Sequence, residues 1–430
     1  RQMCIRDRYK ESLYLDVTAR NDWSSTLAFT ERKSRGFFYP SVGLSWIIPK
    51  SFSMPSLISF GKVRASWSKV GNDIPLFVSN TVGHIAAGGI PQPNDTAPFG
   101  TLKPEMSSSF EIGTEWKFFD YRMDVDLTFY KTNTKNQLFS LPSSAGAAYK
   151  YYFVNAGNIQ NMGVELTFGA VPILTNQFKW NTTLNFSRNK NEVKKLHDDL
   201  ASFIQGDEGF SSSYTMRLVE GGSFGDIYGK AFERDKYGAI VYGRDGLPQE
   251  IGSGNTAKVG NCNPAFLLGW GNSFTYKDFS FYFLIDGHFG GDVLAQTQAV
   301  LDQTGVSKVS GEARTMGYVD LEGHHIYNIK GFYEQVGGRN GVTEYYMYDA
   351  TNIRLRELSL GYTLPKRLLG RKQFLKKAEL SFVARNLFFI YKKAPFDPDA
   401  VLSASNSNQG IDIFGIPTTR SVGFNVKLSF

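Results

Sequence analysis

The chain is poor in the residues that build metal sites and disulfide frameworks. Its 430 residues include two cysteines, Cys4 and Cys262, which allow at most one disulfide bond. The five histidines do not stand at zinc-ligand spacing with a cysteine or a carboxylate. These histidines are His84, His197, His288, His324 and His325. We therefore expect no metal site and no cofactor.

The sequence also offers no persuasive catalytic set. Carboxylate pairs such as Asp124 and Asp126 stand two residues apart, so they share one face of a strand. General acid and base work needs a pocket, and we interpret these pairs as lining a wet interior. We expect no catalytic residues and no enzyme activity.

Charge of one sign is not concentrated anywhere in the chain. The formal net charge is +7, but the basic residues are dispersed and form no stripe. Since nucleic-acid binding needs a clustered basic surface, we expect no nucleic-acid partner.

Long apolar runs are absent, and strict alternation takes their place. No run of eighteen apolar residues occurs, which excludes transmembrane helices. The last ten residues, 421–430, read SVGFNVKLSF. Their odd positions are polar or glycine, and their even positions are apolar, ending on Phe430. Termini are usually frayed and polar, so an apolar last strand suggests one that closes a larger sheet.

The same two-face pattern recurs in three further segments, 110–116, 121–129 and 178–186. In these segments and 422–430, seventeen of nineteen positions in the apolar phase are hydrophobic. One face of each strand is therefore apolar and the other polar. A soluble antiparallel sheet and a membrane barrel both show this alternation, so it leaves the two open.

The lengths of the connections favour a membrane barrel. We expect twelve strands, at 11–20, 38–48, 59–70, 109–118, 121–131, 159–169, 177–188, 264–276, 279–290, 348–364, 378–390 and 419–430. Short turns alternate with long polar stretches, of which 189–263 and 291–347 are the largest and are expected to be structureless outer loops. The prediction is an all-β chain. Its strands would be antiparallel and part of a large transmembrane β-barrel with short periplasmic turns and long extracellular loops.

Seven segments, taken in order, give the chain a family resemblance. They are FFYPSVGLSW (37–46), KVRASWSKVGN (62–72), EIGTEWKFFDYRMDVDLTFYKTNTKNQL (111–138), NAGNIQNMGVELTF (155–168), LRELSLGYTLP (355–365), ARNLF (384–388) and IPTTRSVGFNVKLSF (416–430). With these segments, residues 9–430 resemble the C-terminal barrel region of SusC/RagA TonB-dependent outer-membrane transporters. Residues 1–8, RQMCIRDR, read as a translated adapter sequence, and no signal peptide begins the chain.

The resemblance implies a location in the bacterial outer membrane and a role in nutrient uptake. Barrels of this kind have about 22 strands around a plug, so about ten strands and the plug would be missing here. The implied partners are a SusD-like surface lipoprotein, the TonB complex acting through the missing part, the barrel assembly machinery, outer-membrane lipid, and an oligosaccharide or peptide ligand. A passive porin, or an outer-membrane enzyme with a Ser, His and carboxylate set at the rim, remains the alternative.

Candidate site residues fall into two groups. Loop aromatics could stack on sugar rings or peptide side chains; they are Trp23, Tyr149, Tyr151, Tyr152, Tyr345, Tyr346 and Tyr348. The last strand resembles the C-terminal assembly signal of outer-membrane barrels, carried by Gly423, Val426, Leu428 and Phe430. Asp397, Asp399 and Asp412 could form a Ca²⁺ site, although we favour solvated loop charge.

Overall fold

The computed structural model describes twelve ranges of the chain. They are residues 2–27, 36–76, 78, 83–92, 95–97, 102–142, 147–196, 201–204, 213–254, 256–369, 375–402 and 408–430. The chain divides into two compact units. Unit 1 is Arg1–Ala170 with Asn189–Ala201, and unit 2 is Val171–Arg188 with Ser202–Phe430.

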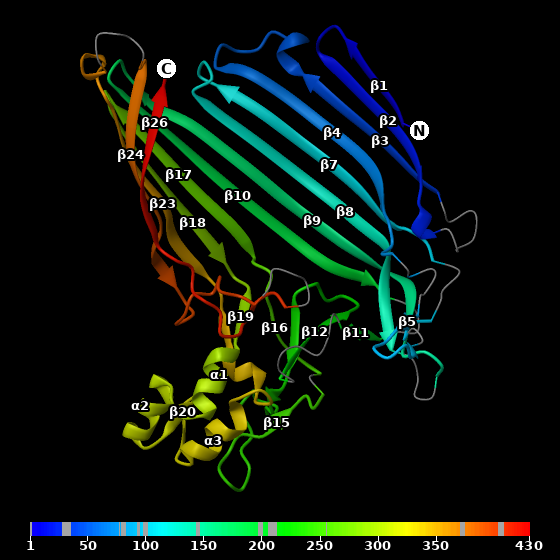
Figure 1. The fold of residues 1–430 in the computed structure, drawn as a ribbon. Helices are drawn as coiled ribbons and strands as arrows, with labels where there is room; N and C mark the ends of the chain where they lie inside the picture. Colours follow the sequence, from blue (N-terminus) through cyan, green and yellow to red (C-terminus); the bar gives the residue numbers. More distant parts are fainter. Residues whose placement is uncertain are drawn as a thin grey trace. The chain divides into compact units, whose positions relative to one another are not determined.

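Unit 1 is built on an antiparallel sheet in which each strand pairs with the next one along the chain (Figure 1). Its strands are β1 (Gln2–Tyr9), β2 (Leu13–Trp23), β3 (Gly36–Ile47), β4 (Ile58–Asn72), β7 (Glu105–Phe118), β8 (Met123–Pro142) and β9 (Tyr151–Leu174), the last of which continues into unit 2. Minor elements are η1 (Ser25–Leu27), η3 (Ile48–Lys50), β5 (His84–Ile85) and β6 (Pro91–Gln92).

Unit 2 has an antiparallel sheet with the same neighbour-to-neighbour order. Its strands are β10 (Phe178–Lys195), which ends in unit 1, β17 (Phe266–Tyr276), β18 (Phe279–Phe289), β23 (Asn352–Thr363), β24 (Lys377–Lys392) and β26 (Ser421–Ser429). The predicted strands are confirmed, with β8, β9 and β10 longer than expected. The predicted strand 348–364 is divided into the short β22 (Met347–Asp349) and β23. The strand β1 is a thirteenth that the sequence did not predict. Its pairing with β2 does not test the origin of residues 1–8, which stays a prediction.

The apolar phase of both sheets is uncovered. In unit 2, Phe424 is 77% exposed and Val426 is 60% exposed, and in unit 1 Ile112 is 44% exposed. A soluble sheet would bury such residues against a second layer. Exposed apolar rows opposite a polar face are the arrangement of strands in contact with lipid. No helix among the described residues is long and apolar enough to cross a membrane.

The short turns are tight. Phe119, Asp120 and Tyr121 follow one another with φ of 53°, 53° and 64° between β7 and β8, and Lys277 has φ of 53° between β17 and β18. Glycine is usual at such angles. Pro365 follows the end of β23 and precedes η5 (Lys366–Leu368), as expected of a residue that cannot continue a strand ladder.

Glycine and asparagine residues cluster at 155–163, inside β9. Gly157 has φ of +83° and Asn136, opposite it in the ladder of β8 and β9, has φ of +59°. Asn155 donates from Nδ2 to the carbonyls of Asn136 and Lys103, at 2.9 and 2.7 Å. Gly157 permits this local irregularity in the ladder.

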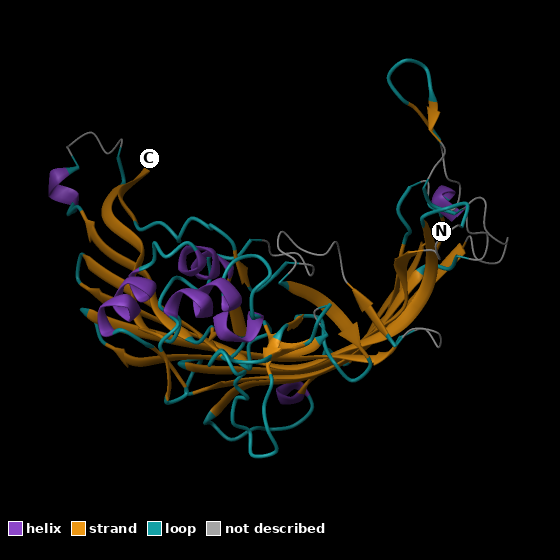
Figure 2. Cartoon of the chain, turned by 90° about the horizontal axis from the view of Figure 1, so that it is seen from below, coloured by secondary structure: helices purple, strands orange, loops and turns teal. Residues whose placement is uncertain are grey.

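The two largest connections are not structureless, so that expectation was wrong. They contain α1 (Gln296–Gln303), α2 (Lys308–Met316), α3 (Ile329–Val336), η4 (Thr343–Tyr346) and the short strands β11 (Ser202–Ile204), β12 (Tyr214–Val219), β13 (Asp226–Gly229), β14 (Ala231–Phe232), β15 (Glu250–Ile251), β16 (Ala257–Asn261), β19 (Asp292–Ala295), β20 (Val319–Leu321), β21 (His324–Ile326) and β22 (Met347–Asp349). Together with β25 (Ile411–Asp412), the described residues of 213–263, 291–350 and 394–418 form what we call the loop domain. Its helices lie together in Figure 2.

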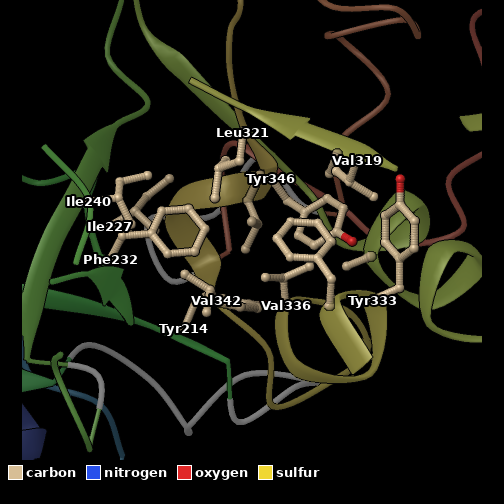
Figure 3. Packing of buried hydrophobic residues seen from close by; sticks show 14 of the residues in the cluster. Tyr214, Ile227, Phe232, Ile240, Val319, Leu321, Tyr333, Val336, Val342 and Tyr346 are labelled. Atoms are coloured by element: carbon tan, nitrogen blue, oxygen red, sulfur yellow. The ribbon is translucent and has the colours of Figure 1, made fainter. Parts of the chain in front are cut away.

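The loop domain has a hydrophobic core of its own. Ile227, from the first connection, packs with Val336, Val342 and Tyr346 from the second (Figure 3). Ile411, from the connection before β26, is also fully buried there. The fold of these segments depends on contacts between residues more than a hundred positions apart, and such contacts leave no periodic signal in either segment.

Candidate functional site: the polar sheet face and the loop domain

The polar face of unit 1 carries a continuous row of uncharged hydrogen-bonding groups. The strand registers place one such residue opposite the next on six successive strands: Thr18, Ser41, Ser68, Ser109, Thr132 and Asn161. Thr18 and Ser41 share a hydrogen bond of 2.5 Å, and Asn191 donates to Asn161 Oδ1 at 3.0 Å. Each hydroxyl can make further bonds as donor or acceptor. This hydroxyl row can therefore bind a neutral polar ligand.

A groove of about 520 Å³ lies along this row. Thr18, Ser41 and Ser68 line it together with Arg20 and Tyr39. The Arg20 guanidinium pairs with the Asp22 carboxylate at 2.8 Å, so the groove presents both signs of charge beside the hydroxyls. Lys69 also lines the groove. A ligand rich in hydroxyl or amide groups would find donors and acceptors here.

A charged cluster lies nearer the short turns of the same face. Arg64 donates from two nitrogens to the Asp126 carboxylate, at 2.7 and 3.1 Å, and contacts Thr128 from one of them. A Cβ at Gly113 would lie 2.7 Å from the Arg64 Nε, so glycine leaves room for the guanidinium. The bidentate geometry fixes the side chain across β4, β7 and β8. This agrees with the interpretation of Asp126 as a group that lines a wet interior.

Unit 2 carries a second polar cluster, at the loop-domain end of β23. Arg354 is 1% exposed and donates to Asp397 Oδ1 and to Thr418 Oγ1, both at 2.8 Å. Asp399 lies 3.1 Å from the same guanidinium, and Arg356 pairs with Asp286 at 2.5 Å. Burial opposes the charge on Asp397. Hydrogen bonds from Thr418 and from the Asp399 N–H, with the Arg354 charge, outweigh burial and lower the Asp397 pKa.

The loop domain has a polar groove of about 700 Å³. Glu233, Arg244, Asp245 and Glu250 line it, with Gln335 donating to the Pro248 carbonyl at 2.7 Å. Nearby, Arg234 bonds Glu322 at 2.7 and 2.9 Å and Glu344 at 2.9 Å. The hydrogen bond from Arg234 lowers the pKa of the Glu322 carboxyl. These ion pairs hold the turn at 234–238 against the β20–β21 hairpin.

Comparison with known proteins identifies the family. The protein family described as "TonB dependent receptor-like, beta-barrel" matches residues 7–387, which is most of the chain. The chain belongs to the TonB-dependent receptor β-barrel family. The polar faces described above are therefore those that turn toward the interior of an outer-membrane barrel, and the exposed apolar faces are those that turn toward lipid.

The chain is similar to individual TonB-dependent receptors, SusC among them. It is 27% identical to TonB-dependent receptor P3 of Formosa agariphila, covering 98% of this chain and 45% of that protein. It is 22% identical to TonB-dependent receptor SusC of Bacteroides thetaiotaomicron, covering 95% and 41%. The fold matches a structure of the RagAB peptide importer in the "closed-closed" state with a TM-score of 0.76, at 18% identity, over 98% of this chain and 46% of that one. The chain thus spans less than half the length of these relatives.

The predicted family, fold class and outer-membrane location are confirmed by these findings. Among the described parts of the chain, no three His, Cys, Asp or Glu side chains are grouped so that they could hold a metal ion. Asp397 and Asp412 are 9% and 8% exposed, so the expectation of solvated loop charge was wrong for both. Asp397 is bound to Arg354 rather than free to coordinate a cation.

The predicted aromatic residues of unit 1 lie in two places. Trp23 ends β2 and is 70% exposed. Tyr149 and Tyr151 are 38% and 45% exposed, and Tyr152 is half-buried at the start of β9. The exposed rings are open to a partner or ligand, but nothing in the geometry brings Trp23 to the others, and their role in binding stays a prediction.

The three predicted tyrosines of unit 2 pack in the loop domain. Tyr346 is 1% exposed and donates from its hydroxyl to Asp302 Oδ2 at 3.1 Å. Tyr345 lies edge-on to Tyr346, with ring centroids 5.0 Å apart, and Tyr348 lies edge-on to Phe396 at 5.6 Å. Burial raises the pKa of Tyr346 and of Asp302. Tyr346 therefore stabilises the loop domain and has no ring face free for a ligand.

Residues 221–225, GGSFG, fit the G-x-S-x-G pattern of hydrolases, a match that our sequence reasoning passed over. That pattern needs a strand-to-helix turn, whereas these residues join β12 to β13. The described contacts of the Ser223 hydroxyl are to Asn261, Asn263, Phe224 and Asp226, and none is to a histidine. The segment is a structural turn.

The assembly-signal residues lie on or beside β26, as predicted. Val426 pairs with Leu380 and Leu428 pairs with Ala378, whereas Gly423 lies on the opposite face. Phe430 follows the strand and is 62% exposed. Their role in assembly remains a prediction.

The hydroxyl row was not predicted from the sequence. Its members are ordinary polar-phase residues, and only the strand registers show that they lie side by side. The two-residue alternation could have identified each of them as facing the interior, but it could not align one strand with the next.

Proposed function

We propose that the chain is the barrel portion of a TonB-dependent transporter that imports oligosaccharides or peptides with a SusD-like surface lipoprotein. The observation that carries the proposal is the hydroxyl row and its groove on the interior face of a chain that belongs to this receptor family. Hydroxyl and amide side chains match the donors and acceptors of sugars and of peptide bonds equally well, so they support both ligand classes.

The lipoprotein partner is proposed from the relatives and from the loop domain. The RagAB peptide importer is described in "closed-closed" and "open-open" states. The loop domain of this chain has a packed core and lies at the ends of β17, β18 and β23 that are opposite the short turns. A rigid domain at the outer ends of the strands is a suitable surface for a lipoprotein lid.

Energy coupling would come from TonB through a plug in a part of the full-length protein outside this chain. Assembly would require the barrel assembly machinery and outer-membrane lipid. The chain contributes binding surfaces and the membrane wall, and no chemical step is proposed for it.

Uptake in cells tests the proposal. The full-length gene is deleted in its host, and uptake of a labelled mixture of neutral oligosaccharides and of a labelled peptide mixture is measured with and without TonB. The proposal expects at least one substrate class to enter only when both the gene and TonB are present. Uptake that needs the gene but not TonB would indicate a passive porin instead.

A further inference from the structure

The apolar face of unit 2 is hollowed near the short turns. A groove of about 400 Å³ runs across β17, β18, β23, β24 and β26. Its walls include Tyr276, Phe279, Phe281, Tyr362, Leu380 and Phe382. Residues of this phase face lipid in the family barrel, so this groove opens into the membrane and not into the transport path.

Ring contacts across neighbouring strands shape this groove. Phe279 and Tyr362 have ring centroids 4.7 Å apart, and Phe382 and Phe424 are 5.7 Å apart. The rings pack in pairs, and the space between the pairs is lined almost wholly by carbon. A flexible hydrocarbon chain would fill such a space better than water could.

Two lysines lie beyond the end of the groove that is nearest the turns, outside its lining. Lys277 forms the β17–β18 turn with Asp278, and its ammonium lies 5.4 Å from the ring centroid of Tyr276. Lys376 precedes β24, donates its backbone N–H to the Ser429 carbonyl at 2.7 Å, and is in phase with Leu380 and Phe382. Both lysines therefore lie beside the apolar face, at its membrane edge.

Neither Lys277 nor Lys376 has an ion-pair partner within the described residues, and Lys377 provides the contrast. Lys377 faces the opposite side of the sheet and pairs with Glu379 at 3.1 Å. Asp278, beside Lys277 in the turn, also forms no ion pair within the described ranges. Lysine side chains at a membrane edge extend their ammonium groups to the level of lipid phosphates.

We propose that this groove is a binding site for an anionic phospholipid of the periplasmic leaflet. An acyl chain would occupy the aromatic groove, and Lys277 and Lys376 would bind the phosphate of the headgroup. The charge of the two lysines favours an anionic headgroup over a zwitterionic one, and the short-turn position assigns the lipid to the periplasmic leaflet.

Native mass spectrometry of the full-length protein tests the headgroup. Protein in mild detergent is given phosphatidylglycerol or phosphatidylcholine with identical acyl chains, and the fraction that keeps lipid is measured. We expect several-fold greater retention of phosphatidylglycerol, and we expect K277Q/K376Q to abolish that preference. The matched control is K377Q, one residue from Lys376 on the opposite face, which should keep the preference.

A second variant tests the groove itself. Leu360 also lines the groove. Leu360→Trp adds bulk there while both lysines remain, and it should lower retention of both phospholipids. Heat-modifiable mobility on gels confirms that the barrel has folded. Equal retention of the two lipids by the unaltered protein would overturn the proposal. Loss of the phosphatidylglycerol preference in K377Q, equal to that in K277Q/K376Q, would also overturn it. So would the finding that the groove holds lipopolysaccharide, or that a second copy of the protein covers this face.

Discussion

The Arg354 guanidinium and the Asp397 carboxylate form a buried ion pair, 2.8 Å apart, between strand β23 and the loop that leads to β26. Their side chains are 1% and 7% exposed. Thr418, near the other end of the same loop, donates its backbone N–H to Asp397 Oδ2 at 3.1 Å. The pair thus closes both ends of this loop onto the wall of the sheet, while β25 within the loop pairs with β19 of the loop domain.

Removing one partner of this pair should be costly. Arg354→Met leaves Asp397 as a buried charge without its partner, and we expect a loss of about 3 to 5 kcal/mol in unfolding free energy. Limited proteolysis within 395–418 and urea unfolding of the full-length protein would measure it. The control is Arg385→Met, because the Arg385 pair with Glu357 spans 3.7 Å and Arg385 is 62% exposed; its loss should be below about 1 kcal/mol. Equal losses would show that the Arg354 pair is not a structural anchor.

The same pair predicts a dependence on pH. The Asp397 pKa is lowered in the folded protein, so its contribution to stability is present above the ordinary carboxyl value of about 3.9 and is lost as the pH falls below it. Proteolysis of 395–418 with an acid-active protease should therefore quicken as the pH is lowered from 5 to 3. The variant Asp397→Asn should cleave quickly at both values. A loop equally protected at both values in the unaltered protein would contradict the prediction.

The two faces of β26 predict that the same substitution will have different costs in stability at two neighbouring residues. Val426 pairs with Leu380 on the apolar face, whereas Asn425 pairs with Ser381 on the polar face. Val426→Arg should cost about 2 to 4 kcal/mol if the residue is near the bilayer midplane, and Asn425→Arg should cost little because its charge stays hydrated. Outer-membrane yield and urea unfolding of the full-length protein measure both. Equal costs would refute the assignment of Val426 and Asn425 to opposite faces. A larger cost for Asn425→Arg than for Val426→Arg would place the strand one residue out of register.

The loop domain should respond to deletions as one unit. Removing 293–348 alone would expose Tyr214, Met216 and Ile227, which pack against that segment. We expect rapid proteolysis of the remaining 213–263 segment, with the barrel still heat-modifiable on gels. Joint deletion of both segments should leave the barrel folded, with 394–418 as the remaining protease-sensitive segment, because Ile411 loses the rest of its core. Loss of heat-modifiable mobility in the joint deletion would instead show that the barrel needs this domain.

The sequence by itself determined the strands and their two faces. A strand's side chains alternate between faces over two residues, so Val426 and Asn425 could be assigned to opposite faces from local order alone. The lengths of the connections then favoured a membrane barrel, and seven segments in order gave the family resemblance. Turn residues such as Lys277 and Asp278 were also local signals, since the chain there has too few residues for anything but a tight turn.

Only the tertiary structure decided what depends on alignment between distant segments. The row from Thr18 to Asn161 exists because of hydrogen-bond registers between strands, which alternation cannot fix. Arg354 and Asp397 are 43 positions apart, and nothing in either neighbourhood marks the other. The loop-domain helices have eight or nine residues, too few to be stable alone. Their stability comes from a shared core, and a shared core is a property of the folded chain.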